Sequence, residues 1–99
     1  MKLSEVIWKD KFVNKIEAKH NVKTYEVEQI LFSKPHVRLA EKGVVKNENL
    51  YAAYGKTFQG RYLIVFFIYK HGRAALPITA REMTFKERRY YDHVQKKSR

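Results

Sequence analysis

The chain of 99 residues contains no cysteine, two prolines, four glycines and a single tryptophan. Without cysteine there is no disulfide, no thiolate zinc site and no cysteine nucleophile. No linker or low-complexity stretch interrupts the chain, so we expect one domain, residues 1–99. The longest apolar run is eight residues, Tyr62–Tyr69, whereas a membrane-spanning helix needs roughly 18. The start of the chain is charged where a leader would be apolar, so we expect a cytoplasmic protein without a membrane partner.

Acidic residues are also few, 10 against 21 lysines and arginines, which gives a net charge of +11. A surplus of this size attracts polyanions, and nucleic acid is the commonest polyanion that a small basic domain meets. The basic residues are spread along the chain, and we expect the last of them, in residues 96–99, to form a frayed tail. The charge therefore predicts nucleic acid, free or as part of a ribosome, as the partner, and the alternative is a surface that is charged only for solubility.

Metal-dependent chemistry has no recognisable set of ligands in this sequence. The histidines have no histidine at i,i+4 and no cysteine beside them; they are His20, His36, His71 and His93. The chain has no HExxH, phosphate-binding P-loop or GxSxG motif, and its acids form no pair spaced for glycosidase or two-metal catalysis. We therefore expect no cofactor, which leaves metal-free chemistry driven by cations.

Apolar periodicity predicts two helices in the first third of the chain. Asp10 can cap a helix over residues 11–20, and Asn21 suits the left-handed residue that ends such a helix. Thr24 can cap a second helix, which ends at about Phe32. The apolar side of each helix marks the face that packs on a core.

After Pro35 the apolar period changes to that of strands. Strands are expected around Val37–Leu39 and at Leu50–Tyr54, Arg61–Lys70 and Ala74–Ala80, with a short apolar segment at Glu5–Trp8. The Arg61–Lys70 strand is apolar on both faces and should be central, while Pro77 requires an edge or a bulge. Thr84 and Glu87 form a capping box for a last helix that reaches about Gln95. These elements predict an α+β fold with two N-terminal helices, a mostly antiparallel sheet of about four strands and one C-terminal helix.

A basic protein without a metal can cleave RNA because the substrate supplies its own nucleophile, the 2′-hydroxyl. The protein has to align the chain, move a proton and neutralise the charge that grows on the phosphoryl oxygens. Arginine suits the last task because its fork matches pairs of phosphate oxygens. The catalytic candidates are Arg81, Glu87, Arg61, Tyr91 and His20, and the candidates for contacts to RNA are Lys19, Lys11, Arg88 and Arg89.

Several of these candidates have a structural alternative. Arg81 precedes a helix N-terminus, which favours phosphate binding, yet it could simply pair with Glu82 or Glu87. Glu87 is the best candidate for a general base, but the capping box by itself accounts for a glutamate there. Tyr91 lies one helical turn after Glu87 and could belong to the core.

A set of segments, in order along the chain, resembles the toxins of BrnT-type toxin–antitoxin modules. They are Trp8, Lys19–Val22, Glu26–Val27, Leu31–Pro35, Gly60–Leu63, Ile78–Met83 and Lys86–Tyr91. The resemblance spans about residues 6–91, and its most specific part is the Thr79–Arg81 block followed by Glu87, Arg88 and a tyrosine. It implies a RelE-like fold and a bacterial ribonuclease that arrests translation, partnered by an antitoxin of the ribbon-helix-helix type.

We therefore interpret the chain as a metal-independent endoribonuclease toxin that acts on mRNA and is neutralised by a cognate antitoxin. One alternative is a non-catalytic RNA- or ribosome-binding module with the same basic surface. Another is a toxin homologue that serves protein–protein contact alone. The sequence leaves open whether the chain forms a homo-oligomer.

Overall fold

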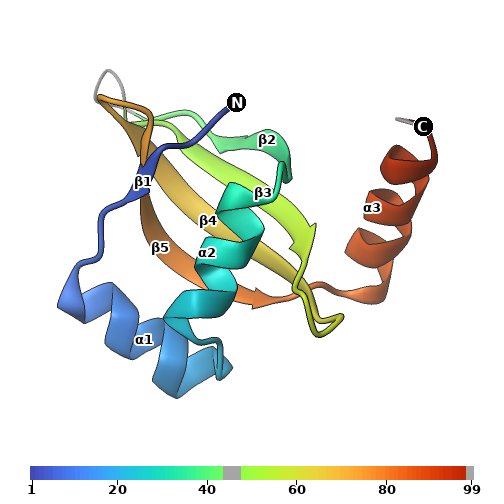
Figure 1. Cartoon of the computed structure of the whole chain (residues 1–99), viewed down its shortest axis with the longest axis horizontal. Helices are drawn as coiled ribbons and strands as arrows, with labels where there is room; N and C mark the ends of the chain where they lie inside the picture. Colours follow the sequence, from blue (N-terminus) through green and yellow to red (C-terminus); the bar gives the residue numbers. More distant parts are fainter. Residues whose placement is uncertain (44–47, 98–99) are drawn as a thin grey trace.

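The computed structural model describes residues 1–43 and 48–97, which form one sheet and three helices. The strands are β1 (Glu5–Val6), β2 (His36–Glu41), β3 (Leu50–Lys56), β4 (Tyr62–Lys70) and β5 (Ala74–Glu82), and the helices are α1 (Asp10–His20), α2 (Thr24–Phe32) and α3 (Phe85–Lys97). Helices α1 and α2 lie on one side of the sheet and α3 on the other (Figure 1). The predicted α+β class is thus confirmed. None of the helices in these two ranges has the length and apolarity to span a membrane.

The sheet has the strand order β1-β5-β4-β3-β2. Strands β2 to β5 form an antiparallel meander with β4 in its middle, as the apolar faces of β4 predict. The expectation of about four strands is incomplete, because β1 adds a fifth strand that runs parallel to β5. Two residues are too few to show the alternation of a strand, so only the pairing of β1 with Ala74 and Ala75 defines it.

Both N-terminal helices lie where the periodicity places them, but their caps differ from the prediction. The N-cap residues are Lys9 and Lys23, both with extended backbone. The expected caps, Asp10 and Thr24, are instead the first helical residues. At the start of α2 the capping group comes from inside the helix, because the Glu26 carboxylate accepts the backbone N–H of Lys23 at 3.0 Å. This carboxylate takes the place of the hydroxyl cap that the sequence suggested.

Helices α1 and α2 enclose the main core against one face of the sheet. Residues Val27, Ile30 and Leu31 of α2 are buried there. Ile30 comes close to β3 because Gly55 has no side chain; a Cβ at Gly55 would lie 3.0 Å from Cδ1 of Ile30. The sheet contributes Ala53, Leu63, Val65, Phe67, Ala75 and Ala80 to this core.

The start of α3 is fixed by the capping box that the sequence predicts. The backbone N–H of Thr84 donates to Glu87 Oε1 at 2.8 Å, and the N–H of Glu87 donates to Thr84 Oγ1 at 3.2 Å. The helix continues through Lys97, past the expected end at Gln95. Its last residues were expected to belong to the frayed tail 96–99, whose final two positions lie outside the described residues.

Helix α3 is attached to the sheet without a buried side chain of its own. None of its described residues is buried. Its Tyr90 and Tyr91 pack on a small cluster on the second face of the sheet, formed by Ala52, Tyr54 and Ile64. The attachment of α3 therefore depends on aromatic and polar contacts more than on apolar burial.

A β-bulge in β5 decides which side chains face α3. Phe67 pairs with Pro77, but Phe66 pairs with Thr79, so Ile78 is an extra residue opposite no partner. This confirms the bulge that Pro77 predicts, and β5 is an inner strand between β1 and β4. Pro77 lies opposite Phe67, a residue of the main core. In a regular strand Arg81, four positions later, would face the same side as Pro77. The extra residue reverses the alternation, so Arg81 faces α3 instead.

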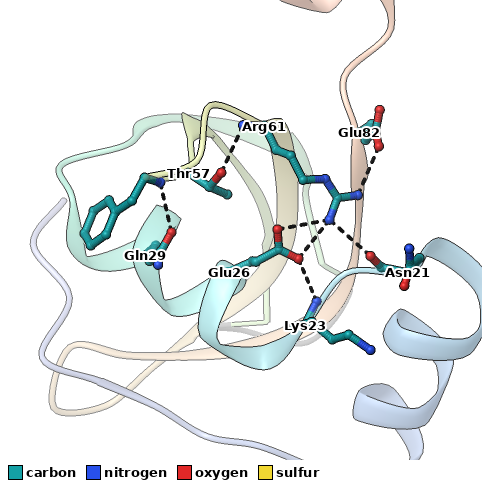
Figure 2. Close-up of polar contacts among 8 residues, drawn as sticks. Asn21, Lys23, Glu26, Gln29, Thr57, Arg61 and Glu82 are labelled. Carbon is teal, nitrogen blue, oxygen red and sulfur yellow. Dashed lines mark hydrogen bonds and ion pairs between the residues drawn. The ribbon is translucent and has the colours of Figure 1, made fainter.

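A polar network ties the helical layer to the sheet (Figure 2). Arg61, just before β4, donates to both carboxylate oxygens of Glu26 at 2.8 and 3.0 Å and to Glu82 Oε2 at 3.0 Å. It also donates to the backbone carbonyl of Asn21 at 3.1 Å. Asn21 ends α1 in the predicted left-handed conformation, with φ 51° and ψ 42°. Arg61 thereby joins α1, α2, β4 and β5, and it compensates the charge of Glu26, which is only 4% exposed.

Replacing Arg61 with Ala should destabilise the fold strongly, because it leaves the buried Glu26 carboxylate without its cation. We expect a loss of about 3 kcal/mol in the free energy of unfolding, which for a domain of this size lowers Tm on the order of 15 °C. Adding Glu26→Gln should recover part of the loss, since it removes the unpaired charge. The exposed Arg89→Ala is the control and should change the free energy of unfolding little. If Arg61→Ala had an equally small effect in urea unfolding, the network would contribute no more than a surface ion pair.

Candidate functional site

The candidate site lies on the face of the sheet beside α3, where four strands place their side chains in register. One row across β2, β3, β4 and β5 consists of His36, Tyr54, Ile64 and Arg81. The neighbouring row consists of Arg38, Ala52, Phe66 and Thr79. Adjacent strands lie about 4.8 Å apart, so each row is about 14 Å wide at the backbone. The first row therefore has its two polar ends, His36 and Arg81, separated by Tyr54 and Ile64.

At the β5 end of this face, Arg81 forms a forked ion pair with Glu87 of α3. The two terminal nitrogens of Arg81 donate to the two carboxylate oxygens of Glu87 at 2.8 and 2.9 Å. The guanidinium also donates to the backbone carbonyl of Glu82 at 3.1 Å and lies 5.6 Å from the ring centroid of Phe66. Two predicted catalytic residues are thus brought together at the N-terminus of a helix.

The charges of this pair are strongly stabilised. The hydrogen bonds from Arg81, joined by the contacts with Thr84 and opposed by burial, lower the pKa of Glu87 to about 2. The same hydrogen bonds raise the pKa of Arg81 above its ordinary value. Glu87 is therefore fully ionised at neutral pH and is a poor proton acceptor there. Its carboxylate occupies the position on the arginine fork that a phosphate would take.

At the β2 end of the same face lies a cluster that sequence analysis missed. His36 Nε2 and the hydroxyl of Tyr90 are 2.7 Å apart. The rings of His36, Tyr54 and Tyr90 lie within 6 Å of one another, and Arg38 Cζ lies 4.8 Å from the centroid of the Tyr90 ring. Burial, and then the charge of Arg38, lower the pKa of His36 below its ordinary value of 6.5. The one available signal in the sequence was the alternation of His36 and Arg38 on one face of a strand.

Of the remaining catalytic candidates, Arg61 and His20 lie on the other side of the sheet from Arg81, and Tyr91 lies on the same side. Arg61 is taken up by the network with Glu26 and Glu82, on the side of α1 and α2. Its position before β4 makes it a link between layers, and its forked contacts are to protein carboxylates. His20 ends α1 in that same layer and is half-buried. Tyr91 packs edge-on against Tyr62 at 6.0 Å between ring centroids, and burial raises its pKa.

The candidates for RNA contacts are likewise dispersed. Lys19 is exposed in the last turn of α1, and Lys11 lies over the ring of Phe12 at the other end of that helix. Arg88 stacks on Tyr62 with its Cζ 3.9 Å from the ring centroid, next to the candidate site, and Arg89 is exposed on α3. Within residues 1–43 and 48–97 no group of three or more histidines and acids could hold a metal ion.

Glu87→Gln should reveal the ion pair as pH-dependent stability. Glutamine can still close the capping box but carries no charge. Because the pKa of Glu87 is about 2 in the fold and 4.5 in a free side chain, the pair stabilises fully above pH 4.5, and this is lost as pH falls toward 2. We expect the variant to be less stable by on the order of 1–2 kcal/mol at pH 7, with the gap closing at low pH. Urea unfolding across pH measures it; a gap that stays constant, as the exposed control Glu41→Gln should give, would contradict the pair.

Comparison with known proteins identifies one family that covers most of the chain. A search of curated proteins gives no match. The family described as the ribonuclease toxin BrnT of type II toxin–antitoxin systems matches residues 8–87. These residues include α1, α2, strands β2 to β5 and the Arg81–Glu87 pair, and they make up most of the chain. The resemblance seen in the sequence is therefore confirmed, and the chain belongs to the BrnT family of ribonuclease toxins of type II toxin–antitoxin systems.

Proposed function

We propose that this protein is a metal-independent endoribonuclease that cleaves mRNA on the sheet face beside α3. The observation that carries the proposal is the forked Arg81–Glu87 pair, in which an arginine offers two nitrogens to two oxygens at a helix N-terminus. A phosphate offers the same pair of oxygens to that fork. Membership of a family of ribonuclease toxins supports RNA cleavage as the reaction class.

In the proposed reaction the 2′-hydroxyl of the RNA attacks the adjacent phosphorus and the 5′-oxygen leaves. Negative charge grows on the non-bridging oxygens, and Arg81 neutralises it. The first turn of α3 lies beside Arg81, so the helix dipole adds to the attraction. Metal independence follows from this division of work, because the substrate supplies the nucleophile and arginine supplies the positive charge.

The Glu87 carboxylate has to dissociate from Arg81 when a phosphate binds there. Its low pKa argues that it holds the Arg81 fork in position in the free protein. The role of general base that the sequence suggests for Glu87 stays a prediction. The two roles differ in outcome, since Glu87→Gln removes a base completely but still leaves an amide oxygen for Arg81 and a cap for α3.

The same chemistry indicates how an antitoxin would neutralise the site. A type II toxin has a protein antitoxin as its partner. We propose one of the ribbon-helix-helix type, with an acidic segment that binds over Arg81 and the neighbouring basic residues of a chain whose net charge is +11. A carboxylate of that segment can bind the arginine fork as Glu87 does.

Arg81→Ala should lower the rate of RNA cleavage about a hundredfold or more, because it removes the cation that stabilises the transition state. Arg81→Lys should recover little, since an ammonium group cannot make the forked contact. Both are measured with a fluorescent RNA in the presence of EDTA, which the native chain should tolerate. Arg73→Asn is the matched control: it also removes one arginine, at the opposite end of β5, and asparagine accepts the backbone φ of 58° there.

Two results would contradict this assignment. Cleavage that stops with EDTA removes metal independence, and full cleavage by Arg81→Ala removes the proposed site. Glu87→Gln separates the two roles of Glu87. A loss as large as that of Arg81→Ala would make Glu87 the base, whereas a loss of a few fold fits the positioning role.

Binding of RNA should weaken steeply as salt rises, because phosphate contacts release counterions. An RNA with a 2′-deoxy sugar at the cleavage site measures this without turnover. Each phosphate contact adds about 0.7 to the slope of log K against log salt for single strands, so Arg81→Ala should lower the slope by about that much. Salt-dependent binding without any cleavage by the native chain would point instead to an RNA-binding module.

A further inference from the structure

We propose that His36 and Tyr90 are the proton-transfer pair of this site and that Arg38 is a second cation for its phosphate. The proposal rests on the ribonuclease function proposed above and adds residues that the sequence did not suggest as catalytic or RNA-binding candidates. Tyr90 also lies beyond residues 8–87, the part of the chain that matches the family. What suggests the pair is the structure alone, since 54 positions separate the two residues.

The first step is the contact itself. His36 Nε2 lies 2.7 Å from the Tyr90 hydroxyl, and the ring centroids are 5.5 Å apart. The Tyr54 ring lies against both, at 5.9 Å from His36 and 5.4 Å from Tyr90. Within the described residues no protein group hydrogen-bonds to His36 Nδ1. One nitrogen of the imidazole is thus held by the tyrosine while the other remains available to a substrate.

The second step is the position of the pair relative to Arg81. His36 and Arg81 are the two ends of one row across the sheet, with Tyr54 and Ile64 between them. Tyr54 lies beside His36, with ring centroids 5.9 Å apart, and it is the residue that separates His36 from Ile64 and Arg81 in the row. Arg38 lies in the next row, beside His36 and over the Tyr90 ring. A phosphodiester over the middle of this face would have an arginine on either side and the histidine within reach.

The third step is the protonation state of the histidine. The groups that face His36 are Arg38 from its own strand, Tyr54 from β3 and Tyr90 from α3, and Arg81 with Glu87 lies farther along the row. Burial, and then the charge of Arg38, lower the pKa of His36 below 6.5. The imidazole is therefore neutral at physiological pH and can accept a proton. This supplies the base that Glu87, with its pKa of about 2, is poorly suited to be.

The proposed transfer conserves every atom. His36 Nδ1 takes the proton of the 2′-hydroxyl as the bond between that oxygen and phosphorus forms. The Nε2 proton of His36 passes to the Tyr90 oxygen, and the Tyr90 proton passes to the 5′-oxygen as its bond to phosphorus breaks. The products are a 2′,3′-cyclic phosphate and a 5′-hydroxyl, and the histidine resets by exchanging its ring protons with water.

A purely structural role for the pair gives different expectations. The His36–Tyr90 contact could serve only to hold α3, which has no buried side chain among its described residues. Its loss would then lower Tm and weaken RNA binding, while the pH dependence of the remaining cleavage stayed unchanged. The test therefore combines a rate with an affinity and a titration.

The experiment measures single-turnover cleavage of a fluorescent RNA by His36→Asn, Tyr90→Phe and the reference Arg81→Ala. We expect His36→Asn to lose about a hundredfold or more and Tyr90→Phe about tenfold, while both bind a 2′-deoxy RNA within about twofold of the native affinity. The control is His93→Asn, which removes an exposed histidine of α3 and should cleave at the native rate. Circular dichroism confirms that each variant is folded.

The titration tests the role of the histidine directly. The acid limb of the pH–rate profile should have its midpoint at the pKa of His36, measured by NMR on the free protein and below 6.5. Arg38→Gln removes a nearby positive charge, so it should move the NMR pKa and the acid limb upward together.

The outcomes separate the two proposals. If the native chain does not cleave RNA, the proposed function fails and takes the pair with it. If Arg81→Ala abolishes cleavage but His36→Asn cleaves normally, the proposed function stands and the pair is overturned. Loss of 2′-deoxy RNA binding in parallel with cleavage, or an acid limb that Arg38→Gln leaves in place while the NMR pKa moves, also overturns it.

Discussion

The orientation of the candidate site depends on one irregularity, the bulge at Ile78. Side chains of a strand alternate between its faces, so a single extra residue exchanges the faces of all that follow. In a regular strand Arg81 would face the same side as Pro77, which is the core under α1 and α2. With the bulge, Arg81 meets Glu87 of α3, and Glu82 turns to Arg61 on the other side. The extra residue Ile78 thus places Arg81 and Glu82, which are neighbours in the sequence, in two different ion-pair networks.

Both networks pair an arginine with a carboxylate, but they differ in how readily the arginine can exchange that carboxylate for another anion. Arg61 neutralises Glu26, which is almost fully buried, so giving up the contact would leave an uncompensated charge inside the protein. Arg81 neutralises Glu87, which is partly exposed, so giving up that contact would leave the carboxylate in reach of water. Sequence reasoning assigned both arginines to catalysis because it read their charge and neighbourhood alone. The two arginines differ in the burial of the partner carboxylate, which is why the proposed function assigns phosphate binding to Arg81 and a structural link between layers to Arg61.

Local signals predicted the parts of the fold that local interactions determine. The capping box of Thr84 and Glu87, the left-handed Asn21 and the bulge at Pro77 are each set by a few neighbouring residues, and each is found. Strand β1 and the cluster around His36 depend on register instead. His36 and Arg38 alternate along a strand, as many surface residues do. Only the alignment of four strands and the contact with Tyr90 of α3 bring them into one cluster. The chain positions that meet there are too far apart for a sequence pattern to connect them.

In the proposed function, the contacts that hold α3 are made by the same groups that the substrate would use. A phosphodiester carries one negative charge, as the Glu87 carboxylate does, so exchanging one for the other on Arg81 changes the free energy of the ground state little. The transition state has more negative charge on its phosphoryl oxygens, and it competes for the fork better than either. Displacing Glu87 costs the same in the ground state and in the transition state, so in the proposed site only the stronger contact of Arg81 with the transition state would accelerate the reaction. In that proposal Glu87 sets how tightly Arg81 binds any phosphate, whereas the preference for the transition state comes from the charge that grows on the oxygens facing the arginine.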